Sequence, residues 1–168
     1  MNPKLYWAKV REEARIPSKR PEDAGYDLYP CFDDDWMEIG PFKTRMVPLG
    51  VASAFDAGYV VFLKERGSTG TKGIAQRSGV IDSGYRGEYL CPVTNLNAKP
   101  LFIVKNDRKA KLLAENTGDE ILMYPYEKAI CQAVMIPIPE ADVEEITYEQ
   151  LEAIPSLRGS GRLGSSGK

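Results

Sequence analysis

Short apolar runs separated by proline and glycine restrict the fold of this chain more than any other feature. The 168 residues include twelve prolines and fifteen glycines. The runs are Met46 to Val51, Tyr59 to Leu63, Tyr89 to Val93, Pro100 to Val104 and Ala133 to Ile138. Their length and spacing are typical of β-strands joined by turns. Pro48, Pro92 and Pro137 lie within or beside these runs, and proline favours sheet edges and bulges because it lacks a backbone N–H. We therefore predict an all-β fold, a distorted jelly roll or β-barrel.

The composition indicates one globular domain with a sizeable core, because 43% of the residues are hydrophobic and chains of this length usually form a single domain. A net charge of −2 gives no signature of nucleic-acid binding. The N-terminus lacks a signal-peptide pattern, and no apolar run approaches the roughly 20 residues of a membrane span. We expect a cytoplasmic protein with no membrane partner. Cys31, Cys91 and Cys131 are odd in number and have no CxxC spacing, so we expect them to be reduced and buried.

The absence of histidine removes several kinds of catalytic site. The sequence contains no histidine, which excludes Ser-His-Asp and Cys-His nucleophiles and His-ligated metal sites. A general base in this chain must therefore be a carboxylate, a lysine, a tyrosine or a cysteine.

Residues 79–87 carry a lone carboxylate and an aromatic ring between glycines. Val80 and Ile81 suit a strand, Ser83-Gly84 supplies a turn, and we expect the strand to resume at Tyr85. In that hairpin Asp82 and Tyr85 would lie at the two ends of one turn, with room for a small molecule between them. The alternative is an ordinary hairpin whose aspartate only caps the turn.

Two glycine-rich segments combine backbone amides with cationic side chains. Residues 64–73 lack the order of a Walker loop, but the amides of Gly67 and Ser68 beside the Arg66 guanidinium suit an oxyanion. Residues 158–168 are too rich in glycine and serine to form a core, and all their charged side chains are cationic. Both segments could bind phosphate. The alternatives are a solvated loop for residues 64–73 and a flexible chain end for residues 158–168.

Two further regions depart from the β pattern. Residues 105–120 are charged and flanked by turn residues, which predicts a surface insertion. Thr147 followed by Gln150 has the spacing of a capping box, which predicts one short helix over Thr147 to Ala153. The predicted domain boundaries are residues 1–157 for the β domain and 158–168 for a glycine-rich arm.

Five segments in a fixed order carry a family resemblance. They are Ala24-Gly25-Tyr26-Asp27-Leu28, Arg66 to Lys72, Gly79 to Gly87, Ile130-Cys131-Gln132 and Arg158 to Gly167. Together they resemble the five motifs of the deoxyuridine triphosphate pyrophosphatase (dUTPase) family. The resemblance implies a homotrimer of jelly-roll subunits with shared active sites. It also implies Mg²⁺-dependent hydrolysis of dUTP to dUMP and pyrophosphate, which limits uracil incorporation into DNA and supplies dUMP for dTMP synthesis.

The resemblance assigns a role to individual residues. Asp82 is implied as the general base that activates the attacking water, and Tyr85 as the ring that stacks on the deoxyribose. Asp27 is implied to act on the metal only through water, with Mg²⁺ otherwise held by the triphosphate. The implied substrate-binding residues are Arg66, Gly67, Ser68, Gln76, Gly79, Val80, Ile81, Tyr85, Leu90, Gln132, Arg158, Leu163, Gly164 and Ser165.

The chain departs from the family pattern at three motifs. Arg66-Gly67-Ser68 stands where Arg-Ser-Gly or Arg-Ser-Ser is usual, and Leu163 replaces the aromatic residue that covers uracil. Glu127-Lys128-Ala129 precedes Ile130 in place of Gly-Asp/Glu-Arg/Lys. Two other classes stay open: a dCTP deaminase, against which residues 81–85 argue, and a trimeric β-domain that binds nucleotide or a regulatory protein without turnover.

Overall fold

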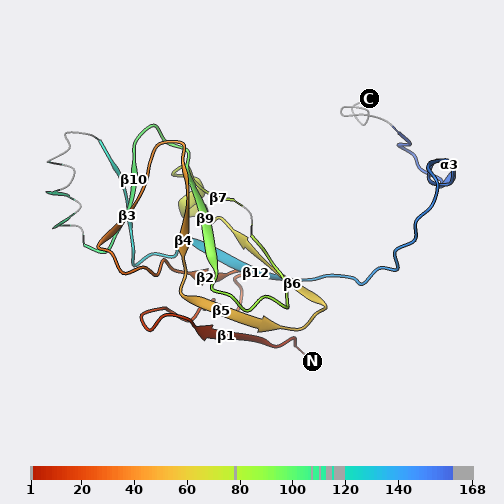
Figure 1. The fold of residues 1–168 in the computed structure, drawn as a ribbon, viewed down its shortest axis with the longest axis horizontal. Helices are drawn as coiled ribbons and strands as arrows, with labels where there is room; N and C mark the ends of the chain where they lie inside the picture. Colours follow the sequence, from red (N-terminus) through yellow and green to blue (C-terminus); the bar gives the residue numbers. More distant parts are fainter. Residues whose placement is uncertain are drawn as a thin grey trace. The chain divides into compact units, whose positions relative to one another are not determined.

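The computed structural model describes residues 2–77, 79–106, 108–109, 111–112, 115 and 120–160. The chain divides into two compact units, Met1–Ile138 and Pro139–Lys168. Figure 1 shows that the first unit holds all the labelled strands, whereas the second holds the helix labelled α3.

In the described part of the first unit, twelve short strands form four small sheets. The strands are β1 (Leu5–Lys9), β2 (Tyr26–Leu28), β3 (Trp36–Ile39), β4 (Thr44–Pro48), β5 (Val51–Phe55), β6 (Tyr59–Lys64), β7 (Ile74–Gln76), β8 (Val80–Ile81), β9 (Leu90–Asn95), β10 (Leu101–Val104), β11 (Leu122–Pro125) and β12 (Cys131–Pro137). The sheet orders are β1-β5, β11-β10-β3, β2-β12-β6-β8 and β4-β9-β7. Neighbouring strands are antiparallel except β10 and β11. The predicted all-β class is confirmed.

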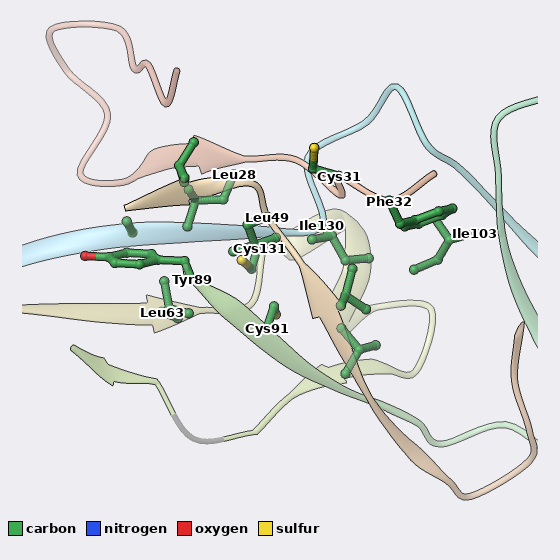
Figure 2. Packing of buried hydrophobic residues seen from close by; sticks show 14 of the residues in the cluster. Leu28, Cys31, Phe32, Leu49, Leu63, Tyr89, Cys91, Ile103, Ile130 and Cys131 are labelled. Atoms are coloured by element: carbon green, nitrogen blue, oxygen red, sulfur yellow. The ribbon is translucent and has the colours of Figure 1, made fainter. Parts of the chain in front are cut away.

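The core lies between these sheets and draws side chains from all four of them. Figure 2 shows Leu49, Leu63, Tyr89, Cys91 and Cys131 among the packed side chains. All three cysteines are buried and free, as the sequence predicted. Large apolar side chains such as those in this cluster each contribute about 1.5–3 kcal/mol when fully buried, so the cluster stabilises the sheets that carry the loops.

Glycine and proline act at specific points of the strands. The predicted run Met46 to Val51 is divided into β4 and β5 because Gly50 has a φ of +68° and a Cβ there would lie 2.6 Å from the Cys31 sulfur. Pro92 lies in β9, the middle strand of its sheet, where edge or bulge positions were predicted. Its carbonyl accepts from the amide of Arg77, just past the end of β7, and its nitrogen faces the same side. The Arg77 carbonyl, which Pro92 cannot serve, accepts from the Gln76 side chain instead.

The structure contains more helix than the one short helix that was predicted. Besides α3 (Tyr148–Ala153), α1 (Gly67–Gly70) forms one helical turn in the predicted phosphate loop, and the described residues between Arg108 and Glu115 are also helical. The α1 turn forms because Thr69 is fully buried and its hydroxyl both donates to the Arg66 carbonyl and accepts from the Arg66 amide. None of the described helices is long and apolar enough to cross a membrane.

The second unit begins with an extended acidic segment and contains α3. Thr147 caps the helix as predicted, because its hydroxyl accepts from the Gln150 amide and the Gln150 side chain accepts from the Thr147 amide. After α3, the Ser156 hydroxyl accepts from the amides of Arg158 and Gly159. The predicted arm residues Leu163, Gly164 and Ser165 lie outside the described residues.

Candidate active site

A polar cleft of about 840 Å³ lies at one end of the β2-β12-β6-β8 sheet. Its lining residues are Ser18, Lys19, Arg20, Glu22, Asp23, Ala24, Gly25, Asp27, Arg66, Gly67, Ser68 and Gln132. Strand register explains the convergence, because Gln132 pairs with Asp27 on one side and with Lys64 on the other. Three of the five family-like segments, which are far apart in the sequence, therefore meet in this cleft.

Arg66 is held in the cleft by contacts on several sides. Its guanidinium forms a two-point ion pair with Asp27, with Nε 2.9 Å from Oδ1 and an Nη 3.2 Å from Oδ2. The other Nη donates to the Ala129 carbonyl at 3.3 Å and lies 3.4 Å from the Ser68 hydroxyl. Such planar two-point contacts fix the orientation of an arginine and also carry charge. Asp27 thus orients the cation that the sequence assigned to the triphosphate.

Gln132 occupies the floor of the same cleft. Its side-chain N–H₂ donates to the Glu65 carbonyl at 2.8 Å. Its amide oxygen lies against the backbone of Gly25, where an added Cβ would be only 2.3 Å away. Glycine is therefore required at position 25 so that the first and fourth family-like segments can approach each other.

A smaller cavity of about 300 Å³ lies beside β6 and β8. Its lining residues are Phe62, Leu63, Lys64, Gln76, Gly79 and Val80. Gly79 has a φ of +135°, and its carbonyl accepts from the Leu63 amide at 2.8 Å. The Gln76 side chain lies against Gly79 and donates to the Arg77 carbonyl at 2.9 Å. The structure thus groups Gln76, Gly79 and Val80, all predicted to read the base.

The prediction of a hairpin around Asp82 and Tyr85 is wrong, because the segments before and after the turn do not pair with each other. The turn is present, since the Tyr85 amide donates to the Asp82 carbonyl at 3.0 Å. However, the strand does not resume at Tyr85: β9 begins at Leu90 and pairs with β4 and β7, whereas β8 pairs with β6. The chain turns away because Tyr85 folds over Gly87, where a Cβ would lie 2.4 Å from its hydroxyl oxygen, and donates to the Glu88 carbonyl at 3.0 Å.

The remaining predicted residues lie apart from the two cavities. Asp82 is exposed, and among the described residues its carboxylate makes no hydrogen bond or ion pair. Tyr85 is 43% exposed and Leu90 is 39% exposed, while Ile81 packs on the core. None of these four residues lines either cavity. Arg158 belongs to the second unit.

Sequence reasoning missed several residues of the polar cleft. Lys19 and Arg20 line it, and both precede the first family-like segment by only a few residues. Arg20 forms a two-point pair with Asp23, with distances of 2.8 and 3.0 Å. Lys19 donates to the Asp23 carbonyl at 2.7 Å and lies over the Tyr26 ring. The adjacent Lys19-Arg20 pair was the available signal, but without a fold nothing linked it to Arg66.

The described residues provide no protein cage for a metal ion. No group of three or more Asp, Glu, Cys or His side chains is gathered in this part of the chain. Both oxygens of the Asp27 carboxylate already accept from Arg66, which leaves only their second lone pairs for a metal-bound water. The donor set fits a Mg²⁺ ion carried by a triphosphate, because Mg²⁺ commonly keeps its waters and binds through substrate phosphates.

Comparison with known proteins identifies the family. The dUTPase family profile matches residues 12–130. The chain is 30% identical over 172 residues to a deoxyuridine 5'-triphosphate nucleotidohydrolase of Mycolicibacterium gilvum, covering 99% of this chain and 97% of the relative. The chain belongs to the dUTPase family. This finding confirms the resemblance inferred from the five segments and the predicted enzyme class, a dUTP diphosphatase. A second such dUTPase, from Mycolicibacterium vanbaalenii, is 31% identical over 95% of this chain and 92% of its own length.

Solved dUTPase structures share this fold. The Staphylococcus bacteriophage 80alpha dUTPase with dUPNHPP has a TM-score of 0.74 at 20% identity, covering 98% of this chain and 99% of the phage chain. The EIAV dUTPase has a TM-score of 0.63 at 18% identity, covering 86% and 98%. A D95N mutant dUTPase of phage phi11 of S. aureus coordinates a structural Mg(II) ion. These similarities confirm the predicted dUTPase-like β fold.

Proposed function

We propose that this dUTPase hydrolyses dUTP to dUMP and pyrophosphate by attack of water on the α-phosphorus, with Asp82 as the general base. The observation that carries the proposal is the convergence of Asp27, Arg66 and Gln132 in one cleft. Three separate family motifs supply these residues, and their side chains suit the triphosphate of a nucleotide. In the cell, the reaction would limit uracil incorporation into DNA and supply dUMP for dTMP synthesis, and we propose a cytoplasmic location.

The five family-like segments contain two carboxylates, Asp27 and Asp82, and their surroundings favour Asp82 as the base. Contact with Cys91 and burial raise the pKa of Cys131 well above its ordinary value, so this thiol stays protonated. Burial likewise raises the pKa of Tyr124 and of Cys31. Asp27 is paired with Arg66, whereas Asp82 is exposed in a turn and has no cation partner among the described residues. A positioned base of this kind contributes about 10²- to 10⁴-fold to a rate.

The smaller cavity supports recognition of uracil by backbone groups. Gly79 and Val80 would present their backbone to the base edge, with Ile81 behind them and Gln76 beside them. Cytosine would leave these polar groups unpaired, at a cost of roughly 1–3 kcal/mol for each group. Tyr85 would stack on the deoxyribose and exclude a 2′-hydroxyl, with Leu90 at the edge of the site.

The polar cleft supports binding of the triphosphate. Arg66, the amides of Gly67 and Ser68, and Gln132 would contact its oxygens. Mg²⁺, when bound with the nucleotide, would neutralise charge on the phosphates. Arg158, Leu163, Gly164 and Ser165 of the proposed arm, residues 158–168, would cover the substrate and exclude water.

We further propose a homotrimer with shared active sites. Neither cavity is lined by Asp82 or Tyr85, so one chain alone does not surround a triphosphate with the proposed base. A closed ring of three copies would bring the missing groups from neighbouring subunits. In this arrangement residues 1–157 form the β domain, with residues 105–120 as a surface insertion.

Pyrophosphate release from dUTP, dTTP, dCTP and UTP with Mg²⁺ tests the proposal. The wild type should act on dUTP alone, and Asp82→Asn should lower the rate by about 10²-fold or more while dUTP binding is retained. Asp56→Asn, which changes another exposed turn carboxylate, is the matched control and should keep the native rate. Ammonia from dCTP would instead indicate a deaminase, and binding without release a non-catalytic domain. A native rate in Asp82→Asn would refute the assignment of the base.

A further inference from the structure

Tyr124 is a buried tyrosine that shares a hydrogen-bond acceptor with Arg66, a residue of the polar cleft. The residue belongs to β11 and is only 1% exposed. Its hydroxyl donates to the Ala129 carbonyl at 2.7 Å. Burial raises the pKa of this phenol, so it remains a neutral donor. Tyr124 is not among the residues that line the cleft.

The Ala129 carbonyl joins Tyr124 to the phosphate-binding residues. The same oxygen accepts from an Arg66 Nη at 3.3 Å, and that Nη lies 3.4 Å from the Ser68 hydroxyl. The Arg66 guanidinium and the Ser68 hydroxyl both act to lower the pKa of Tyr124, against the larger effect of burial.

Ser68 lies two positions after Arg66, in the first turn of α1, where its side chain needs a partner to fix its orientation. Its neighbour Gly67 has no side chain that could restrain it, and no atom lies within 4 Å of where a Cβ of Gly67 would be. An exposed serine hydroxyl rotates freely unless a partner holds it. Asp27 holds Arg66 through Nε and one Nη, and the Ala129 carbonyl, which also accepts from Tyr124, accepts from the other Nη.

We propose that Tyr124 is a positioning residue of the triphosphate site, whose buried hydroxyl fixes the Ala129 carbonyl and, through it, holds Arg66 and Ser68 in the orientation that binds the substrate phosphates. The inference rests on the proposed function, since it assumes that Ser68 and Arg66 contact the triphosphate. Tyr124 itself touches no substrate. Its effect should therefore fall on the phosphates and leave recognition of the nucleoside unchanged.

The test compares Tyr124→Phe with Tyr126→Phe. Both changes remove one phenolic oxygen from a shielded tyrosine, but Tyr126 packs edge-on against Phe32 with ring centroids 5.0 Å apart and does not contact Ser68 or Arg66. Binding of the non-hydrolysable α,β-imido analogue of dUTP should weaken about tenfold in Tyr124→Phe, the effect of losing hydrogen bonds that orient a charged group. Inhibition by deoxyuridine, which has no phosphate, should keep its native constant, and Tyr126→Phe should change neither quantity.

Ser68→Ala supplies a second and independent measurement. Ser68 is exposed, so its removal leaves the fold intact, and it should weaken analogue binding by a similar factor. The double variant should be little weaker than either single variant, because both lose the same oriented hydroxyl. Circular dichroism shows whether Tyr124→Phe is folded; if it is not, a loss of less than twofold in Ser68→Ala refutes the inference.

The outcomes separate this inference from the proposed function. Native analogue binding in Tyr124→Phe, or an equal loss of deoxyuridine affinity, overturns the positioning role while dUTP hydrolysis by the wild type still stands. Additive losses in the double variant also overturn it. A wild type that neither binds the analogue nor releases pyrophosphate from dUTP overturns both.

Discussion

Gly79→Ala should destabilise the protein and damage the base cavity at the same time. Gly79 has a φ of +135°, a conformation that is essentially restricted to glycine. A Cβ at this position would lie 2.7 Å from the Leu63 carbonyl oxygen and 2.7 Å from the Gln76 side-chain nitrogen. The Gln76 side chain could move, but the Leu63 backbone is held in β6.

The expected magnitude follows from these two contacts. Backbone strain of this kind costs of order 1–3 kcal/mol. Relief of the clash would require breaking the hydrogen bond from the Leu63 amide to the Gly79 carbonyl, which contributes about 1 kcal/mol. The free energy of unfolding should therefore fall by about 2–4 kcal/mol. For a chain of this length each kcal/mol corresponds to roughly 2–4 °C, so Tm should fall by at least about 4 °C.

Thermal melts at one protein concentration, together with dUTP kinetics, check this prediction. Gly58→Ala is the matched control, because no atom lies within 4 Å of its added Cβ and its φ is not positive. Gly79→Ala should also raise KM for dUTP, since the backbone shift moves the cavity lining. If Gly79→Ala melts at the same temperature as Gly58→Ala and keeps the native KM, the strain argument is refuted.

Three further perturbations test other parts of the structure. Truncation after Ser156 should lower the dUTP turnover rate much more than Tm, because the described arm residues, 158–160, belong to the second unit and are exposed; a large loss of Tm would contradict this. Asp27→Asn should lower kcat/KM about tenfold or more, because Arg66 loses a charged two-point partner, whereas Asp35→Asn, which removes the partner of Lys109 elsewhere, should leave it native. Burial raises the pKa of Tyr89 to about 12, and the unfolded tyrosine ionises near pH 10, so stability should decline as pH rises from about 10 to 12. Urea melts at several pH values should show a shallower decline in Tyr89→Phe, and an unchanged slope would refute this.

Local chemistry made the strands and the capped helix predictable. The run Tyr59 to Leu63 became β6, and the spacing of Thr147 and Gln150 gave the N-terminus of α3, because each signal acts within a few residues. The break at Gly50 was less visible, since it depends on the close approach of Cys31. The pairing of β8 with β6 rather than β9 depends on how Tyr85 folds over Gly87, which no local pattern shows.

The candidate site was predictable as a set of residues but not as a geometry. The resemblance to the family identified Arg66, Gln76 and Gln132. It did not reveal that Asp27 pairs with Arg66, because that contact depends on the register between β2, β12 and β6. Tyr124 carried no sequence signal, since a single tyrosine in a strand looks like any other core residue.

The pairing of β2 with β12 sets the order in which the protein can be completed on the ribosome. Asp27 and Gln132 are register partners, so about a hundred residues must be synthesised before the phosphate cleft has both its walls. At a synthesis rate of about 5–20 residues per second, the edge of β2 stays unpaired for roughly 5 to 20 s before β12 is made. The bridge between Ser18 and Asp27 covers the opposite edge and limits mispairing during this interval. A nucleotide can therefore stabilise the finished enzyme but cannot assist the nascent chain before β12 has emerged.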